Sequence, residues 1–378
     1  MTSSGHRPRL AFLITSSGAG GAEQQVRALA IAFRSRGWDV AVLSMLPLEP
    51  LLLELADYGV ELASVGMSRG IPDPRGVWRL RRFLRRWRPD VLHAHMVHAN
   101  LLARVSRLVI STPVIVSTMH NQNEGAQWRY VAYRLTDRLT DITTTVSRLA
   151  VSEAVRRGAV TSKRIRLVPN GIDLAPYVAN APLREATREA LDIGDRFAWL
   201  AVGRLTEAKA YDDMIAAFAR VARRDDQAIL LVAGDGPLEN DVRTWIDRAG
   251  PVGRIRLLGH RADVPALMQA ADGFVLSSAW EGLPMVLLEA AAAALPLVAT
   301  DVGGTREVVL DAVSGHVTPA GDVTALGSAM LSVMALPAAA RRSMGEAGRA
   351  HVAARFELAS VVTVWEQLYQ ALLARAGR

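Results

Sequence analysis

Short runs of apolar residues alternate with longer amphipathic stretches along most of this 378-residue chain. The apolar runs are continuous and rich in β-branched residues, which is typical of strands buried on both faces in a parallel sheet covered by helices. The pattern predicts seven strands in the first half, with helices between them: 9–15, 39–45, 60–66, 90–95, 113–120, 141–147 and 164–170.

The stretch 168–196 interrupts this alternation with turn residues and charges, among them the turn dipeptide Asn170-Gly171. The alternation then resumes, with strands expected at 197–203, 228–234, 254–259, 273–278 and 295–301. We therefore expect two α/β domains, each a doubly wound parallel sheet. In such pairs a ligand usually lies between the domains, at the carboxyl ends of the strands.

Composition excludes several classes of site. Half of the residues are hydrophobic, 21% are charged and none is Cys, so there is no disulfide, no thiolate nucleophile and no cysteine-based zinc site. Residues 1–9 are short and polar, and we expect no signal peptide. The uncharged run Val323–Ala340 contains polar residues and Pro337, which favours a buried helix and its break over a membrane span. A cytoplasmic protein is expected.

Positive charge is concentrated in the first half of the chain. Residues 1–185 hold 25 Lys or Arg and 14 Asp or Glu, a net charge of +11. The excess peaks in 75–90, where Trp78, Phe83 and Trp87 share or flank a helical face among arginines. A solvated helix, a contact with an anionic membrane surface and a nucleic-acid patch stay open; the aromatic residues favour the membrane over solvation alone. No usual nucleic-acid module is recognisable, and we expect no nucleic-acid partner.

The first predicted strand runs into "TSSGAGGAEQQ" (15–25), whose small residues allow backbone N–H groups to close on an anion at the start of a helix. Gly20 and Gly21 are the candidates. It is not a dinucleotide-binding fingerprint, since Glu23 stands where the third Gly would be. A plain turn is the alternative.

Lys209 is one of only two lysines in a chain with 44 Lys plus Arg. Thr206 has the character of a helix N-cap, which would place Lys209 in the first helical turn. A cation there opposes the helix dipole at a cost of roughly 0.3–1 kcal/mol, and a bound anion would reverse that sign. The alternative is a chance position on a solvated helix face.

The segment 277–309 contains two glutamates, Glu281 and Glu289, separated by seven residues. Pro284 suits the first position of a helix, so that Glu281 precedes the helix and Glu289 lies more than a turn inside it. The two carboxylates are then too far apart to share a proton and would touch different parts of one long ligand. Free N–H groups of Gly282 and Leu283 would face an anionic centre between them. A capping Glu and a surface Glu are the alternative.

Several motifs in order carry a family resemblance. "EGLPMVLLEA" resembles the E-x7-E motif of the retaining GT-B glycosyltransferases of family 4. Further segments similar to that family cover nearly the whole chain: 20–23, 117–120, 168–173, 202–218, 230–240 and 255–278. Ala210 departs from the pattern, because the family usually has Gly after the lysine.

The resemblance implies an α/β GT-B fold, with two Rossmann-like doubly wound domains facing each other across a cleft. Residues 1–180 would bind the acceptor, with the C-terminal helix 357–378 crossing back onto them. Residues 190–356 would bind the nucleotide-sugar donor.

The resemblance also implies roles for individual residues. Arg204 and Lys209 would bind the donor diphosphate. Glu289 would accept hydrogen bonds from the ribose, and Glu281 would hold hydroxyls of the donor sugar. The remaining roles are phosphate binding by the backbone of Gly20 and Gly21, contact with the nucleobase by His260 and Arg261, and contact of His120 with the donor sugar near the reacting centre.

His120 and Glu281 are thus the candidate catalytic residues. A satisfied core histidine is the alternative for His120. His93, His95 and His98 imitate a metal site, but without a nearby carboxylate we interpret them as structural.

An Asp-x-Asp pair, which metal-dependent sugar transfer commonly needs, is absent from the sequence. We therefore expect transfer without a metal or other cofactor, the leaving diphosphate being stabilised by fixed positive groups. The expected reaction moves a sugar, with retention, from a nucleoside-diphosphate sugar, by default UDP-sugar, to a saccharide hydroxyl. Front-face attack is preferred, because no carboxylate nucleophile is evident.

The acceptor is expected at the inner face of a bacterial plasma membrane, as a lipid-linked saccharide for cell-surface polysaccharide, reached through the basic helix 75–88. Two alternatives stay open: a sugar-nucleotide epimerase of GT-B architecture and a non-catalytic nucleotide-sugar-binding protein.

Overall fold

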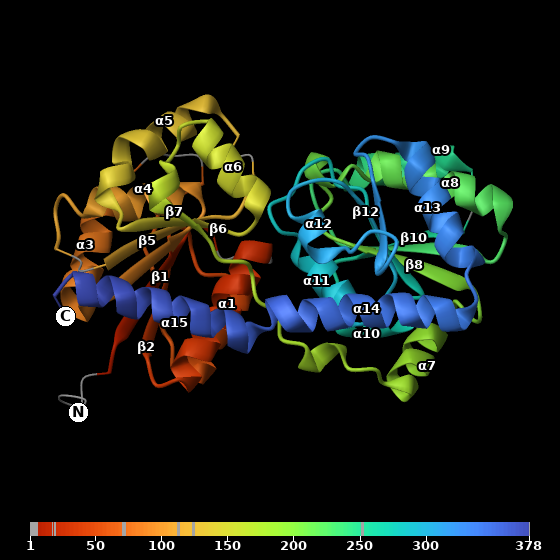
Figure 1. Cartoon of the computed structure of the whole chain (residues 1–378), viewed down its shortest axis with the longest axis horizontal. Coiled ribbons are helices and arrows are strands. Elements are labelled where there is room, and N and C mark those ends of the chain that lie inside the picture. The colour runs from red at the N-terminus through yellow and green to blue at the C-terminus, as the bar shows by residue number, and fades with distance from the viewer. Residues whose placement is uncertain are drawn as a thin grey trace. The chain divides into compact units, whose positions relative to one another are not determined.

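A computed structural model describes residues 7–16, 18, 20–69, 73–111, 114–122, 125–250 and 253–377. Ser17 and Ala19, in the predicted anion-binding loop, lie outside the described residues. The chain divides into two compact units, each described here by itself. The first comprises Met1–Gly171 with Leu358–Arg378, and the second comprises Ile172–Glu357 (Figure 1).

The first unit is built on a seven-stranded parallel sheet with the order β3-β2-β1-β4-β5-β6-β7. Every strand lies within one of the predicted apolar runs, so the sequence pattern is confirmed here. The strands are β1 (Arg9–Ile14), β2 (Asp39–Ser44), β3 (Glu61–Ser64), β4 (Val91–His95), β5 (Val114–Met119), β6 (Ile142–Thr145) and β7 (Ile165–Leu167).

Helices cover both faces of this sheet, because the strand order reverses direction between β1 and β4 and crossovers between parallel strands are right-handed as a rule. Alternate residues of β1 therefore enter different cores: Leu10 and Phe12 pack with the helices of one face, Ala11 and Leu13 with those of the other. The first face carries α1 (Gly21–Ser35), α2 (Pro50–Leu53) and α15 (Leu358–Arg375); the second carries α3 (Arg75–Trp87), α4 (Val97–Ser106), α5 (Gln127–Thr136) and α6 (Arg148–Arg156).

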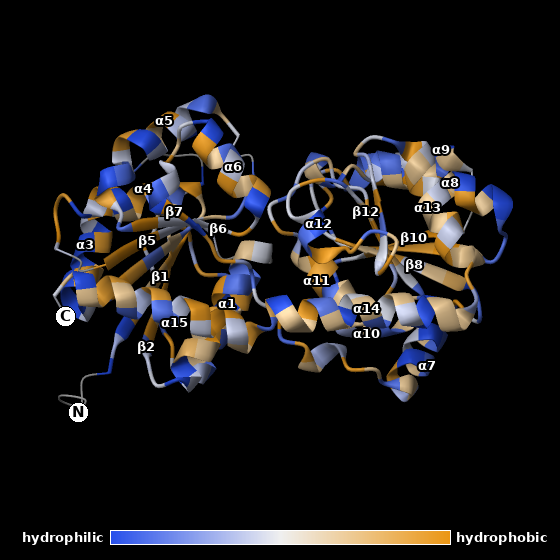
Figure 2. Ribbon diagram, in the orientation of Figure 1, coloured by the Kyte–Doolittle hydropathy of each residue, from blue (hydrophilic) through white to orange (hydrophobic). Residues whose placement is uncertain are grey.

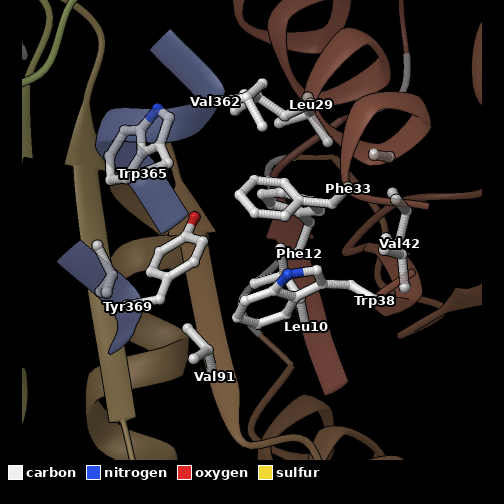
Figure 3. Packing of buried hydrophobic residues seen from close by; sticks show 14 of the residues in the cluster. Leu10, Phe12, Leu29, Phe33, Trp38, Val42, Val91, Val362, Trp365 and Tyr369 are labelled. Atoms are coloured by element: carbon white, nitrogen blue, oxygen red, sulfur yellow. The ribbon is translucent and has the colours of Figure 1, made fainter. Parts of the chain in front are cut away.

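The C-terminal helix α15 is an integral part of the first unit. Its Trp365 and Tyr369 pack among aromatic residues of β1 and α1, and the Trp38 side chain closes the cluster (Figure 3). The indole Nε1 of Trp38 donates a hydrogen bond of 2.9 Å to Glu366. Burial of such large rings makes this interface a substantial part of the core, at about 1.5–3 kcal/mol for each buried apolar side chain.

The second unit contains a six-stranded parallel sheet with the order β10-β9-β8-β11-β12-β13. Five strands fall in predicted runs: β8 (Phe197–Val202), β9 (Ala228–Ala233), β10 (Ile255–Gly259), β11 (Gly273–Leu276) and β12 (Leu297–Thr300). The edge strand β13 (Gly315–Thr318) was not predicted, because its four residues include His316 and Thr318 and form no apolar run. In Figure 2 the strands of both sheets are coloured predominantly as hydrophobic.

The helices of the second unit flank its sheet, and short 3-10 turns occur in both units. The helices are α7 (Ala181–Ala190), α8 (Tyr211–Arg224), α9 (Glu239–Ala249), α10 (Val264–Ala270), α11 (Met285–Ala292), α12 (Thr305–Val308), α13 (Val323–Ala335) and α14 (Ala338–Phe356). The 3-10 turns are η1 (Glu54–Tyr58), η2 (Asp137–Leu139), η3 (Ser162–Arg164), η4 (Ala175–Tyr177) and η5 (Glu207–Lys209).

The uncharged run 323–340 forms α13 and the break before α14, as predicted. Across the described ranges, no single helix is long and apolar enough to cross a bilayer, although α13 and α14, bent by 117°, satisfy the criteria of length and composition together.

Candidate functional site

The strand order of the second sheet reverses between β8 and β11, so the loops that follow these two strands are neighbours at the carboxyl edge. Ligands of doubly wound sheets bind at this position. Lys209, in the loop after β8, and Glu281, in the loop after β11, meet there: Nζ lies 2.6 Å from Oε1. Both side chains are largely buried, with 18% and 14% of their surface exposed. The opposite charges were both predicted as site residues, but their direct pairing was not.

Lys209 lies in a helical turn that follows Thr206, as predicted, but this turn is a separate 3-10 turn and not the first turn of a longer helix. Lys209 ends the 3-10 turn η5, and α8 begins only at Tyr211. Ala210 separates them because it takes a left-handed conformation, with φ 45° and ψ 55°. Thr206 precedes η5 and its side chain makes no capping hydrogen bond to the described residues. The cation is therefore stabilised by Glu281 rather than destabilised by a helix dipole.

The left-handed backbone at Ala210 also accounts for the departure from the family pattern. Gly adopts this conformation without strain, whereas Ala carries a cost of about 1–3 kcal/mol. The hydroxyl of Ser277 donates to the carbonyl oxygens of Lys209 and Ala210, at 2.7 and 2.9 Å. The strained turn is thus held from the loop after β11.

One further contact joins the two loops, and another holds Glu281 within its own loop. The N–H of Ala279 donates to the carbonyl of Ala208 at 2.9 Å, and the hydroxyl of Ser278 donates to Glu281 Oε1 at 2.7 Å. Oε1 of Glu281 therefore accepts from both Ser278 and Lys209. Sequence reasoning missed Ser277 and Ser278, although two hydroxyl residues directly after an apolar run are a recognisable sign of a strand end with polar function.

The backbone around Glu281 is clamped by the loop after β12. Gly303 has φ 54°, and a Cβ at this position would lie 2.4 Å from the carbonyl oxygen of Glu281. The N–H of Gly304 donates to the carbonyl of Gly282 at 2.7 Å. The N–H groups of Gly282 and Leu283 find no acceptor among the described residues. Binding of an anion by these two groups stays a prediction.

Glu289 lies inside α11, as predicted, but Pro284 precedes the helix as its N-cap instead of occupying its first position. Burial raises the pKa of Glu289 to about 7, and the charge of Lys209 opposes this rise. Lys209 therefore lies in the field of both glutamates. Burial is the main cause of the raised pKa of the Tyr177 hydroxyl, and the charge of Glu289 raises that pKa further.

The remaining predicted residues of this unit surround the same edge of the sheet. Arg204 is exposed, in the loop between β8 and η5. The N–H of Gly234, in the loop after β9, donates to the carbonyl of Gly259, at the end of β10. The loop that contains His260 therefore lies beside the loop after β9. His260 is exposed.

Arg261 is already engaged within the protein. Its Nε and a terminal nitrogen lie 2.7 and 2.6 Å from the two carboxylate oxygens of Asp263, and this pairing raises the pKa of Arg261. Contact of Arg261 with a nucleobase stays a prediction. In that contact the base would stack on the face of the guanidinium or accept from its remaining N–H groups.

In the first unit the strand order reverses between β1 and β4, and Gly20 and Gly21 lie in the loop after β1 and at the start of α1. The carboxylate of Glu23 occupies this end of α1. A Cβ on Gly20 would lie 2.4 Å from Glu23 Oε2, and the hydroxyl of Ser16 donates to Glu23 Oε1 at 2.6 Å. A negative group thus lies next to the backbone for which phosphate binding was predicted, and that role stays a prediction.

His120 follows β5 and contacts a second histidine that sequence reasoning treated as structural. Its Nε2 lies 2.9 Å from Nδ1 of His95, at the end of β4, and the rings stack. Burial lowers the pKa of His120 to about 4 and that of His95 well below its usual value. Both rings are therefore neutral at physiological pH, and one nitrogen donates to the other.

The two other histidines of the predicted cluster, His93 and His98, lie in different environments. His93 is buried and bonded through its ring nitrogens to the Tyr369 hydroxyl and to Thr118, each at 2.6 Å, in agreement with a structural role. His98 is exposed on α4. Within the part of the chain that the structure describes, no three His, Cys, Asp or Glu side chains are grouped so as to hold a metal ion.

The predicted basic helix 75–88 is α3, but its aromatic residues do not share an exposed face. Trp87 is buried and lies against Arg9, and Phe83 packs at the margin of the core. Only Trp78 is exposed. Several arginines of α3 are engaged with neighbouring groups: Arg75 and Arg79 with Asp73, Arg86 with Glu61, and Arg81 with a backbone carbonyl.

Comparison with known proteins covers both units. The family described as Glycosyltransferase Family 4 matches residues 19–176, and the family described as Glycosyl transferases group 1 matches residues 184–351. The chain is similar to glycogen synthase of Mycobacterium tuberculosis, with 29% identity over 95% of this chain and 92% of the relative.

Two further likenesses are informative. An Escherichia coli UDP-Gal:alpha-D-GlcNAc-diphosphoundecaprenol alpha-1,3-galactosyltransferase is 26% identical over 70% of this chain and 71% of the relative. The crystal structure of Anabaena Alr3699/HepE in complex with UDP-glucose superposes with a TM-score of 0.86 at 21% identity, covering 96% of this chain and 99% of that one. The latter likeness is one of fold.

Proposed function

Because the chain belongs to the GT-B glycosyltransferases of family 4, we propose that it transfers a sugar, with retention, from a UDP-sugar to a hydroxyl of a saccharide or lipid-linked saccharide. Sugar transfer from a nucleotide sugar is supported by the glycosyltransferase relatives. UDP is favoured as the nucleotide because the galactosyltransferase relative is named for UDP-Gal and Alr3699/HepE was crystallised in complex with UDP-glucose. The proposed reaction uses no metal ion or other cofactor.

The observation that carries this proposal is the group of complementary charges at the strand-order reversal of the second unit. Lys209 offers three N–H donors and uses one on Glu281, so it can also contact a phosphate oxygen. The free N–H groups of Gly282 and Leu283 provide further donors. Arg204, exposed in the adjoining loop, would bind the diphosphate as a fork.

The two glutamates would receive the neutral parts of the donor. Glu281 is fixed by Lys209 and Ser278, which leaves its other carboxylate oxygen, Oε2, for hydroxyls of the sugar. Glu289, just over one turn into α11 and held in a poorly solvated position, would accept hydrogen bonds from the ribose. His260 and Arg261 would contact the nucleobase, and Gly20 and Gly21 the phosphates.

In the proposed reaction the bond between the anomeric carbon and the diphosphate oxygen breaks while the acceptor oxygen bonds to the same face of that carbon. The acceptor proton passes to an oxygen of the leaving diphosphate. Fixed donors that meet the growing negative charge lower the barrier, and removing one such donor typically costs about 10²–10³ in rate. His120, neutral because of its low pKa, would donate or accept a hydrogen bond at the donor sugar, without acting as a charged group.

We propose the cytoplasmic face of a bacterial plasma membrane as the place of this reaction, in cell-surface polysaccharide synthesis. The galactosyltransferase relative is named for a diphosphoundecaprenol acceptor, which supports a lipid-linked acceptor here. The basic helix α3, with the exposed Trp78, is the membrane contact that the sequence suggests.

The test is product analysis with a panel of nucleoside-diphosphate sugars and lipid-linked saccharides in the presence of a chelator. The proposal predicts UDP and an extended saccharide with an α-linkage when the donor is an α-linked UDP-sugar. An altered nucleotide sugar formed without an acceptor would instead identify an epimerase. Donor binding without any turnover across the panel would favour a binding protein.

A further inference from the structure

The helix α5 of the first unit presents a stripe of large apolar side chains to solvent. Trp128, Val131 and Leu135 are 54%, 50% and 78% exposed, and their spacing of three and four residues places them on one face. The opposite face of α5 packs against the core of the unit, where Tyr130 and Tyr133 are fully buried. The exposed stripe therefore does not contribute to the core of the unit.

Positive charge borders this stripe. The guanidinium of Arg129 lies 5.6 Å from the ring centre of Trp128, and Arg134 and Arg138 are exposed. Among the described residues, the nearby carboxylates are engaged in ion pairs with other arginines. These pairs are Asp137 with Arg164, Asp141 with Arg107, and Glu153 with Arg156 and Arg157.

The stripe belongs to a larger basic layer. Residues 75–157, which include α3, α4, α5 and α6, contain 15 Arg against 5 Asp or Glu. Since α4 contacts both α3 and α5, and all four helices cover the same face of the sheet, their outer sides form one side of the unit (Figure 1). Three more large apolar side chains are exposed within this span: Trp78, Leu108 and Leu149.

We propose that this side of the first unit binds the surface of an anionic lipid bilayer, and that α5 is the element that enters it. Trp128, Val131 and Leu135 would lie in the headgroup region, with Trp at the depth where aromatic rings are favoured. The arginines around them would bind lipid phosphates. This binding does not depend on sugar transfer and goes beyond the contact through α3.

Charge decides between a bilayer and a second copy of the chain as the occupant. Two such faces would bring basic layers against each other, in a chain whose net charge is +7. Anionic headgroups instead provide the opposite charge across the whole layer, and apolar insertion together with several basic residues gives stable attachment where either alone gives little.

The test is co-sedimentation of the full chain with vesicles of phosphatidylcholine alone and of phosphatidylcholine mixed with phosphatidylglycerol. We expect binding to the mixed vesicles, weaker binding on addition of salt, and at least about a tenfold loss of affinity in Trp128→Ser with Leu135→Ser. Arg134→Glu with Arg138→Glu should reduce binding to the mixed vesicles and should not change binding to phosphatidylcholine vesicles. Val364→Ser is the matched control: Val364 is 47% exposed on α15, which covers the opposite face of the sheet, and its replacement should leave vesicle binding unchanged.

Three results would overturn the proposal: no binding of the unaltered chain to either vesicle, unchanged binding of the Trp128 and Leu135 variant, or a concentration-dependent dimer that this variant abolishes. The melting temperature with and without UDP monitors folding and the proposed donor site separately. A variant that loses vesicle binding but keeps its UDP response isolates the membrane surface from the sugar chemistry.

Discussion

Lys209 and Glu281 form an ion pair of 2.6 Å across the point where the strand order of the second sheet reverses. Each comes from a loop on a different side of this reversal; Ser277 joins the two loops, and Ser278 holds the Glu281 carboxylate. The opposite charges of Lys209 and Glu281 therefore compensate each other. A diphosphate that binds here would share Lys209 with Glu281, so that donor binding and the position of Glu281 are coupled.

Replacing Lys209 should therefore weaken binding of UDP strongly. Hydrogen bonds to charged groups contribute about 1.5–3 kcal/mol, so Lys209→Met should reduce affinity by about tenfold to a hundredfold. Isothermal titration calorimetry would measure the affinity of each variant for UDP. Lys163→Met, which removes the other lysine from an exposed turn of the first unit, is the matched control and should leave the affinity unchanged. Equal affinities for both variants would contradict the assignment of Lys209.

The raised pKa of Glu289 predicts a pH dependence of stability. Since burial raises this pKa from 4.5 to about 7, the folded protein holds the proton more tightly than the unfolded chain does. The resulting stabilisation is fully present below pH 4.5 and is lost as the pH rises through 7. Because Glu289 is partly accessible, we expect a loss of about 1–2 kcal/mol in the free energy of unfolding across this range.

Urea denaturation at pH 5.5 and pH 8, as test conditions on either side of about 7, would measure this difference in the unaltered protein and in Glu289→Gln. The variant, which cannot ionise at this position, should lose less stability between the two pH values. Identical pH dependence of the two proteins would show that Glu289 does not carry the effect.

The close packing of Gly303 on the Glu281 loop predicts a local defect in Gly303→Ala. The new Cβ would meet the Glu281 carbonyl oxygen at 2.4 Å, in addition to the backbone strain at φ 54°. Gly321→Ala is the matched control: its φ of 78° imposes similar strain, but a Cβ there meets nothing within 4 Å. We expect about 1–3 kcal/mol of destabilisation in Gly321→Ala, a larger loss in Gly303→Ala, and loss of UDP binding only in Gly303→Ala. Preserved binding in Gly303→Ala would refute the clamp.

The sequence predicted the twelve strands that lie in apolar runs, because a parallel sheet buried on both faces leaves a continuous local pattern. It failed at β13, a short edge strand, and at the turn of Lys209, where the left-handed Ala210 ends η5 against local preference. The pairing of Lys209 with Glu281 and of His95 with His120 joins distant segments. Local pattern carries no information on such contacts, nor on the burial that raises the pKa of Glu289.

The contact of His95 with His120 predicts that His120 stays neutral well below its usual titration range. Because burial sets its pKa at about 4, its NMR resonances should not shift between pH 8 and about pH 5. His95→Ala opens space beside the ring for water, so the pKa of His120 should rise toward 6.5. His120→Gln would identify the resonances. Titration of His120 near 6.5 in the unaltered protein would contradict the burial argument.

The central claim is that fixed positive groups of the second unit bind the diphosphate without a divalent ion. The most direct measurement is the shift in melting temperature caused by a panel of UDP-sugars in the presence of EDTA, for the unaltered protein and for Arg204→Ala with Lys209→Ala. The account predicts a stabilising shift in the unaltered protein that EDTA leaves intact and the double variant loses. A shift that requires added Mg²⁺ or Mn²⁺, or one that persists in the double variant, would contradict it.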